Sequence, residues 1–323
     1  MVKQRVEYLD YVRGMAILLV VLGHMYNVED PIRVLIYSFH MPLFFIISGF
    51  FANKNIKLLD LIKKKFKTLM IPYFAFGAVI MIIMYVTNGY DNELAVYIQH
   101  FISGVGRDAL WFLLCLFLIE IIFNIVMKLK YTTLQTVVFL TLFIIGLYGE
   151  YINHNMMVMI TLMRAFVGLG FYAVGYYTYK YINKINVPYL ILVVLFLFNC
   201  FLAFENTWID LWALRFGNRL IYVTCSLLGS VSMILLFKKL GDLNKFKYIF
   251  KLFGSNTLTI MATQQIIINY INRATKQQYY IGFKGFYMFL LVIIIEIPII
   301  YVVNNYASWI LGNFKNKNSV EAV

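Results

Sequence analysis

Long apolar runs separated by short polar connections follow one another along nearly the whole chain. Ten of these runs approach the ~20 residues that a helix needs to cross the hydrocarbon core of a bilayer. They lie at about 8–26, 33–52, 69–88, 109–127, 133–149, 157–179, 188–204, 218–237, 255–272 and 286–310. The pattern predicts an all-α integral membrane protein, built as a bundle of about ten transmembrane helices.

The polar segments between the runs are too short to form a separate soluble domain. The longest are the connections 53–68 and 238–254, and a short polar tail occupies 311–323. The segment 94–108 is too polar to cross a bilayer, so we expect it to lie outside as an amphipathic or re-entrant piece. Residues 1–323 are therefore expected to form a single polytopic domain, and any chemistry must be done by the helical bundle itself.

Positive charge gathers on alternate connections. Only 13% of the 323 residues are charged, about half the share in a soluble domain. The net charge of +13 therefore comes largely from lysine clusters, of which the connection 53–68 is the richest: Lys54, Lys57, Lys63, Lys64, Lys65 and Lys67. The positive-inside rule places such connections and both chain ends in the cytoplasm. It also explains the charge through contact with a lipid bilayer, expected to be the plasma membrane, rather than through a nucleic-acid partner.

The opposite connections are assigned to the outside of the membrane. Most acidic residues lie there, including Asp108 and Asp210, and Arg33 is counted with them as a charge at the outer end of the second run.

Charged and titratable side chains interrupt the first apolar run. Arg13 and His24 are 11 residues apart, which turns a helix about 20° past three full turns and separates the two by ~16 Å along its axis. Asp10 lies one turn before Arg13 and close to the same stripe. Because such residues are costly in a membrane helix, they usually mark a substrate path or a catalytic site.

The chemistry of this pair suggests transfer of an acyl group. A neutral imidazole at His24 can take a proton from an alcohol that attacks an ester or a thioester. Arg13 is suited to gripping phosphate, and its ~16 Å offset from His24 is comparable with a phosphopantetheine arm. The simpler alternatives are an interfacial histidine bonded to a loop and an arginine that reaches lipid headgroups.

Other ionisable side chains inside predicted spans need partners there. Arg164 requires a partner that Glu120 or Glu296 could supply, so structural pairing and substrate binding both stay open for this arginine. Each glutamate is protonated, paired or functional. His40 precedes Pro42, which predicts a local irregularity in the second span.

No metal-binding or nucleotide-binding motif accompanies these residues. Cys115, Cys200 and Cys225 all fall within apolar runs and lack ligand spacing, so they are predicted to be small buried apolar residues. No metal cofactor is expected, and the sequence contains neither a P-loop nor a dinucleotide fingerprint.

Several segments together carry a resemblance to a known family. The most specific is R-x10-H within YLDYVRGMAILLVVLGH at 8–24, followed by FHMPLFFIISGFF at 39–51 and KKKFKTLMIPYF at 63–74. LWFLLCLF at 110–117 and RAFVGLGFYAVGYY at 164–177 match further segments. In these motifs the chain resembles the acyltransferase 3 family of integral membrane O-acyltransferases, and in the last two its sugar O-acetyltransferase branch.

The resemblance implies an acyl-CoA donor, usually acetyl-CoA, bound from the cytosolic side. The acyl group would pass to a hydroxyl of an envelope glycan or its lipid-linked precursor, usually outside. Carried over by motif, His24 would be the catalytic base, Arg13 would bind the donor or organise the site, and Arg164 would lie in the same cavity.

The chain departs from the family pattern at two places. The family's basic loop often contains R-x-x-R, and the nearest match here is Lys64 with Lys67, which would hold the donor by charge but without bidentate geometry. Gln264 stands where a similar segment often ends in histidine, and glutamine cannot carry a proton.

Two other classes of function fit the same pattern. A polysaccharide exporter or flippase would also need intramembrane arginine and glutamate residues along its path, although no repeat with paired broken helices is evident. A membrane sensor module is a third alternative. The sequence leaves open the acyl group, whether acetyl, longer or succinyl, and whether transfer is direct or passes through an acyl-histidine.

Overall fold

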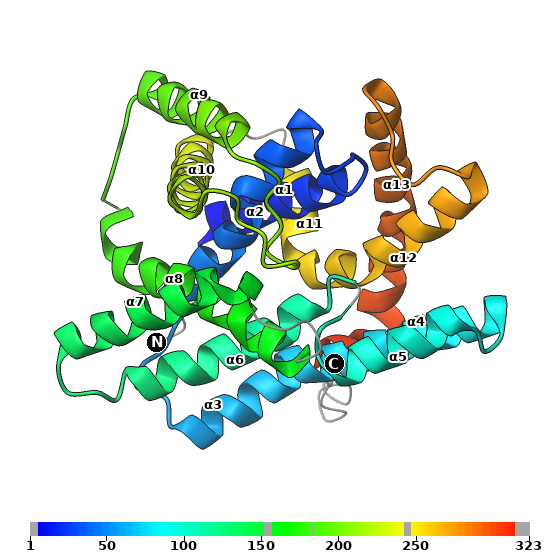
Figure 1. Ribbon diagram of the computed structural model, residues 1–323, viewed down its shortest axis with the longest axis horizontal. Helices are drawn as coiled ribbons and strands as arrows, with labels where there is room; N and C mark the ends of the chain where they lie inside the picture. Colours follow the sequence, from blue (N-terminus) through cyan, green and yellow to red (C-terminus); the bar gives the residue numbers. More distant parts are fainter. Residues whose placement is uncertain (1–5, 107, 152–156, 183, 242–246, 314–323) are drawn as a thin grey trace, which may run out of the picture.

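Helices make up nearly all regular structure of the chain (Figure 1). The computed structural model describes residues 6–106, 108–151, 157–182, 184–241 and 247–313. Its α-helices are α1 (Glu7–Gly23), α2 (Pro31–Phe50), α3 (Leu58–Lys65), α4 (Ile71–Asn88), α5 (Asn92–Ile102), α6 (Trp111–Val126), α7 (Thr132–Leu147), α8 (Met157–Ile182), α9 (Tyr189–Glu205), α10 (Arg219–Leu240), α11 (Lys247–Ser255), α12 (Thr257–Thr275) and α13 (Phe283–Tyr306). Shorter helical turns are η1 (Phe66–Met70), η2 (Gly149–Tyr151) and η3 (Ser308–Leu311). The described residues form no strand, and an isolated bridge joins Asp210 to Arg215.

The helices confirm the all-α membrane class. Each of the ten predicted runs contains a helix, and five helical stretches are long and apolar enough to cross a bilayer: Pro31–Phe50, Leu58–Asn88, Met157–Ile182, Arg219–Leu240 and Phe283–Tyr306. Three shorter helices, α6, α7 and α9, are also apolar. The number of crossings and the cytoplasmic placement of both ends stay predictions.

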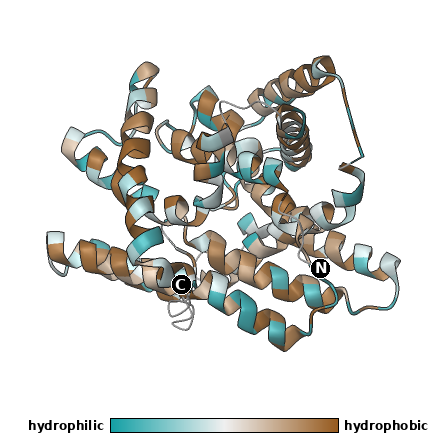
Figure 2. Ribbon diagram, turned by 180° about the vertical axis from the view of Figure 1, so that it is seen from behind, coloured by the Kyte–Doolittle hydropathy of each residue, from teal (hydrophilic) through white to brown (hydrophobic). Residues whose placement is uncertain are grey.

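The outer helices present apolar surface. Figure 2 shows α9 and α13 mainly in hydrophobic colours, and their side chains Leu190, Leu197, Phe201 and Ile294 are among the exposed large hydrophobic residues. In a bilayer these exposed apolar side chains would face hydrocarbon, so no additional protein needs to cover them.

Both long polar connections contain a helix, which the prediction of plain loops missed. The first holds α3, which runs through η1 into α4, and the second holds α11. A side chain on Gly14 of α1 would meet the backbone carbonyl of Phe250, and one on Gly254 would meet that of Asp10, so α1 and α11 cross in direct backbone contact. The predicted tail at 311–323 includes the end of η3, and its residues 314–323 lie outside the described part of the chain.

The predicted outside piece at 94–108 begins as a helix. Within it α5 lies beside α4 (Figure 1). Tyr73 of α4 stacks on Phe101 at 4.5 Å between ring centroids and donates its hydroxyl to the Phe101 carbonyl at 2.6 Å. This contact fixes the start of the loop that leads to Asp108.

Two helices, α1 and α2, lie at the centre of the molecule (Figure 1). Asp30 caps α2 by accepting a hydrogen bond from the backbone nitrogen of Ile32 at 2.9 Å, and Pro31 occupies the first turn. This sharp start places Arg33 in the first turn of the helix, at the end of the second run where its charge was counted.

The second helix continues through Pro42, although a local irregularity was predicted there. Proline has no backbone N–H and therefore frees the carbonyl four residues earlier, which belongs to Ser38. The hydroxyl of Ser226 on α10 donates to that carbonyl at 2.9 Å. The neighbouring helix thus satisfies the acceptor that proline leaves open, and His40 stays in regular helical register.

Close packing of α2 on α8 depends on Gly49 and Gly175, because a side chain on either would meet the backbone of the opposite helix. We expect Gly175→Ala to destabilise the protein by roughly 1–3 kcal/mol, the usual cost of overpacking, measured as thermal unfolding in detergent. The matched control is Gly170→Ala on the same helix, where the added carbon meets the ring of Phe143 and not backbone. Equal stability losses in the two variants would contradict this packing argument.

Candidate active site

One cavity of about 550 Å³ extends between α1, α2 and α12, and α6 also contributes to its wall. Along α1, α2 and α12 the lining residues recur at intervals of three or four positions, in places as adjacent pairs, which is one face of each helix. The wall includes Arg13, Ile17, Val20 and His24 of α1; Arg33, Tyr37, His40, Met41, Phe44 and Ser48 of α2; and Thr257, Leu258, Met261, Gln265, Ile268, Asn269 and Asn272 of α12. Arg13 and His24 therefore share a cavity, as their spacing on α1 predicts.

The cavity has two chemically different ends. Helix α12 starts near Asp10, because α11 before it packs there, and the segment after it returns to α1, where the nitrogen of Tyr280 donates to the Met25 carbonyl at 2.9 Å. Helix α2 runs the opposite way, with Arg33 near His24 and Ser48 towards Arg13. We call these regions the Arg13 end and the His24 end.

At the Arg13 end, the expected pairing with Asp10 is present. A guanidinium nitrogen of Arg13 lies 3.5 Å from a carboxylate oxygen of Asp10, one turn earlier. The guanidinium carbon also lies 4.9 Å from the ring centre of Phe51. The Arg13 side chain nevertheless keeps 29% of its surface exposed, so the carboxylate orients the cation without removing it from the cavity.

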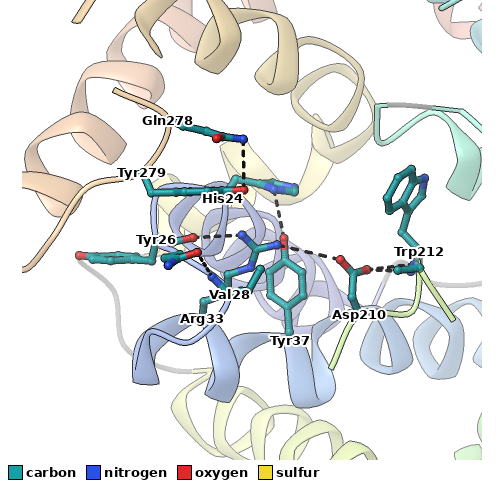
Figure 3. A network of polar contacts seen from close by, with 11 residues as sticks. His24, Tyr26, Val28, Arg33, Tyr37, Asp210, Trp212, Gln278 and Tyr279 are labelled. Carbon is teal, nitrogen blue, oxygen red and sulfur yellow. Dashed lines mark hydrogen bonds and ion pairs between the residues drawn. The ribbon is translucent and has the colours of Figure 1, made fainter. Parts of the chain in front are cut away.

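At the His24 end, the imidazole is held by a tyrosine (Figure 3). His24 follows the last turn of α1, and its Nδ1 lies 3.1 Å from the hydroxyl of Tyr37. Where Nδ1–H donates to the Tyr37 oxygen, Nε2 keeps its lone pair and can accept a proton from a substrate; in the other tautomer Nε2 carries the hydrogen and can only donate. A general base needs the first of these two tautomers, in which Tyr37 holds Nδ1–H and Nε2 is the basic nitrogen.

Tyr37 is itself fixed by a buried ion pair (Figure 3). The guanidinium carbon of Arg33 lies 4.5 Å from the Tyr37 ring centre, and Arg33 donates to the Tyr26 carbonyl at 3.0 Å. A carboxylate oxygen of Asp210 lies 4.0 Å from the same guanidinium. A chain of contacts therefore runs from Asp210 through Arg33 and Tyr37 to His24.

The loop between α9 and α10 brings Asp210 and Trp212 to the cavity wall. Asp210 accepts from the backbone nitrogen of Trp212 at 2.9 Å, and burial raises the pKa of its carboxyl, which the Arg33 charge opposes. Trp212 donates its indole N–H to the Gly106 carbonyl at 2.8 Å. These bonds hold the loop against the segment that follows α5.

His40 lines the same cavity, three residues after Tyr37. Its Nδ1 lies 2.8 Å from the Ile36 carbonyl, so Nδ1 carries the proton in this bond. The ring centres of His40 and Tyr37 lie 4.7 Å apart. His40 is thus placed beside the His24–Tyr37 pair in a supporting position.

The structure corrects the expected surroundings of Arg164. Its guanidinium donates to the carbonyls of Trp212 at 2.7 Å and Val105 at 2.6 Å, and it lies 5.4 Å from the ring centres of both Trp111 and Trp212. Neither Glu120 nor Glu296 is its partner. The cavity wall contains the two indoles but not Arg164, which therefore supports the wall from behind.

The two glutamates have other partners. A carboxylate oxygen of Glu120 lies 2.5 Å from the ammonium of Lys65, which comes from the basic connection. Glu296 is fully buried and accepts from the hydroxyl of Thr263 at 2.9 Å. Both groups are thus accounted for by contacts outside the cavity wall. Gln264 is also fully buried and outside that wall, whereas the next residue, Gln265, lines it.

The two lysines assigned to donor binding lie beside the cavity and not in its wall. Lys64 and Lys67 are exposed on α3 and η1, and Leu69, two residues after Lys67, belongs to the wall. The wide turn η1 precedes Pro72, whose ring cannot fit against the carbonyl four residues earlier in a regular helix. The basic segment therefore leads directly to the cavity without contributing a cation to its lining.

Sequence reasoning missed Arg33, Tyr37 and Asp210. Arg33, Tyr37 and His40 are spaced four and three apart and share one face of α2, a signal visible in the sequence once the helix is started at Pro31. Asp210 lies in a loop far along the chain, and no local pattern connects it with α2.

The fold and the cavity together define a polytopic α-helical membrane protein with a histidine-containing polar site inside the bundle. Comparison with known families assigns the class further: the family model Acyl_transf_3, described as an acyltransferase domain, matches residues 6–305. The chain belongs to this family of membrane acyltransferases. No match was found among curated proteins or among solved structures.

The ion pair between Lys65 and Glu120, outside the cavity wall, can be tested for its contribution to stability. We expect Lys65→Met to lower stability by about 2 kcal/mol, because it leaves a buried carboxylate unpaired, and Lys65→Met with Glu120→Gln to recover most of that loss. Thermal unfolding in detergent measures both. Lys63→Met, an exposed neighbour on α3, is the control. A double variant no more stable than the single one would show that the pair is not responsible.

Proposed function

We propose that the protein transfers an acyl group, most simply acetyl, from cytosolic acyl-CoA to a hydroxyl of a cell-envelope or exported glycan. The observation that carries this proposal is the shared cavity, with a phosphate-binding type of side chain at one end and an anchored imidazole at the other. The axial offset of ~16 Å matches the length of a phosphopantetheine arm. Family membership supports the acyl-transfer class.

The donor is proposed to enter at the Arg13 end. Arg13, oriented by Asp10, would bind a phosphate of CoA. Lys64 and Lys67 outside the wall would attract the remaining negative charge. The positive-inside rule puts this basic segment, and therefore the donor, on the cytoplasmic side. The apolar stretch between the ends, including Ile17, would accommodate the uncharged arm.

At the His24 end, Nε2 would remove the proton from the acceptor hydroxyl as the oxygen attacks the thioester carbonyl. The carbon–oxygen bond forms, the carbon–sulfur bond breaks, and the CoA thiolate leaves with a proton returned from the imidazolium. Tyr37 keeps Nδ1 engaged throughout and so orients the ring. The products are an O-acylated glycan and free CoA.

The reaction is tested with purified protein in lipid nanodiscs, radiolabelled acetyl-CoA and envelope glycan from cells that lack this gene. We expect His24→Ala to lower transfer by about 100-fold or more, the usual contribution of a general base, at unchanged thermal stability. His100→Ala is the matched control, because that histidine lies on α5 outside the cavity wall.

Full activity of His24→Ala would overturn the assignment of the base. Deletion of the gene separates the enzyme from the exporter alternative. Glycan that is exported without acyl groups supports acyl transfer, whereas glycan retained inside the cell supports export.

Donor binding is tested separately through Arg13. We expect Arg13→Gln to raise the KM for acetyl-CoA about tenfold or more, since a charge-assisted hydrogen bond to phosphate is lost, with little change in the KM for the glycan. Arg13→Lys should retain part of the affinity, because it keeps the charge but not the fork geometry. An unchanged donor KM in Arg13→Gln would place the phosphates elsewhere.

A further inference from the structure

The face of α12 that lines the cavity changes character along its length. Near the Arg13 end it presents Leu258 and Met261, whereas near the His24 end it presents three amides, Gln265, Asn269 and Asn272. Their spacing of four and then three residues keeps all three amides on one stripe. Amides in a membrane helix are costly, and the change of character coincides with the position of His24.

Part of the hydrogen-bonding capacity of this stripe is already used. Gln265 donates to the Oδ1 of Asn269 at 3.2 Å, and Asn272 donates to the Gln278 carbonyl at 3.1 Å and accepts from Tyr280 at 3.0 Å. Within the described residues, no bond is made by the Nδ2 of Asn269 or by the Oε1 of Gln265. The cavity wall thus offers one donor and one acceptor side by side, and a hydroxyl group can satisfy both.

Aromatic side chains complete this end of the cavity. Trp212 and Tyr279 both lie in its wall. Trp212 is rigid, because its indole N–H binds the Gly106 carbonyl and its own carbonyl binds Arg164. A cavity that is lined by both aromatic rings and amides is suited to a ligand that is apolar on its ring face and polar at its edge. A sugar ring has that character.

The charged groups in the described wall at this end are already paired. Arg33 is shared between Asp210 and the Tyr26 carbonyl through its terminal nitrogens, and its buried Nε has no partner among the described residues. Asp108 accepts from the Tyr97 hydroxyl and from the Leu110 nitrogen. An anionic ligand would meet two carboxylates and a guanidinium that is already shared with Asp210 and Tyr26, and an ammonium ligand would have to compete with Arg33. The electrostatics of the site therefore favour a ligand without net charge.

We propose that the His24 end is a binding site for an uncharged, hydroxyl-bearing sugar residue, held by Gln265 and Asn269 against Trp212. As a statement about the acceptor, this rests on the proposed function, because it places that sugar's hydroxyl at His24. Sugar binding can nevertheless be measured without any acyl transfer. The cavity thereby separates its two substrates by charge, with the polyanionic donor at Arg13 and the neutral acceptor at His24.

Binding is tested with four pentasaccharide probes on the purified full chain in detergent. Two are neutral, built from glucose and from N-acetylglucosamine; one is anionic, built from glucuronate; one is cationic, built from glucosamine. Tryptophan fluorescence reports occupancy, and Trp212→Phe identifies the responsible indole. We expect at least one neutral probe to bind about tenfold or more tightly than either charged probe.

Three variants locate the site. Gln265→Leu and Asn269→Leu are each expected to weaken binding of the neutral probe about threefold to tenfold, the effect of one lost hydrogen bond, while CoA binding stays unchanged. Gln277→Leu, an exposed amide outside the cavity wall, is the control. Asn269→Asp keeps the shape but adds a charge, and we expect it to shift preference towards the glucosamine probe.

The possible outcomes separate this inference from the proposed function. Charged probes that bind as tightly as neutral ones, no binding of any probe, or unaltered binding in the Gln265 and Asn269 variants would overturn the inference. Neutral-sugar binding without acyl transfer would retain it and remove the proposed function. Acyl transfer that neither leucine variant changes would retain the proposed function and overturn the inference.

Discussion

The arrangement of the bundle follows from one constraint, which is that a polar helix face cannot be left against hydrocarbon. Helix α1 carries Arg13 and His24 on one face, and burial of that face requires neighbours that also offer polar groups. Helices α2 and α12 meet this need, because each turns a mixed face towards α1. The polar residues of these three helices thus gather around a cavity, while α9 and α13, whose exposed side chains are mainly apolar, remain at the outside.

Within this bundle, three arginines are held by different kinds of partner. Asp10 on the same helix orients Arg13, a loop carboxylate and a carbonyl hold Arg33, and two carbonyls with two indoles surround Arg164. The Arg13 side chain keeps 29% of its surface exposed and lines the cavity, whereas Arg164 lies outside the wall and donates to the carbonyls of Trp212 and Val105. Arg33 lines the cavity but is paired with Asp210, and its guanidinium also packs on the ring of Tyr37, which contacts His24.

The graded polarity of the cavity suits a reaction between two unlike substrates. A cation, an apolar middle and an amide-rich aromatic end follow one another along α1 and α12. In the proposed reaction this order would present a nucleotide thioester from one side and a glycan hydroxyl from the other, with His24 where they meet. The same order would let the membrane protein react across the bilayer without carrying either substrate through it.

The sequence by itself determined the helical membrane class, the family, and the common direction of Arg13 and His24, because hydropathy and helical periodicity are local properties of the chain. It also pointed to Asp10 as the partner of Arg13. Only the tertiary structure decided the remaining partners: Lys65 for Glu120, carbonyls for Arg164, Asp210 for Arg33 and Ser226 for the carbonyl freed by Pro42. These pairs join segments far apart in the chain, and a buried polar group accepts whichever partner the packing brings within reach, so residue type alone does not specify the choice.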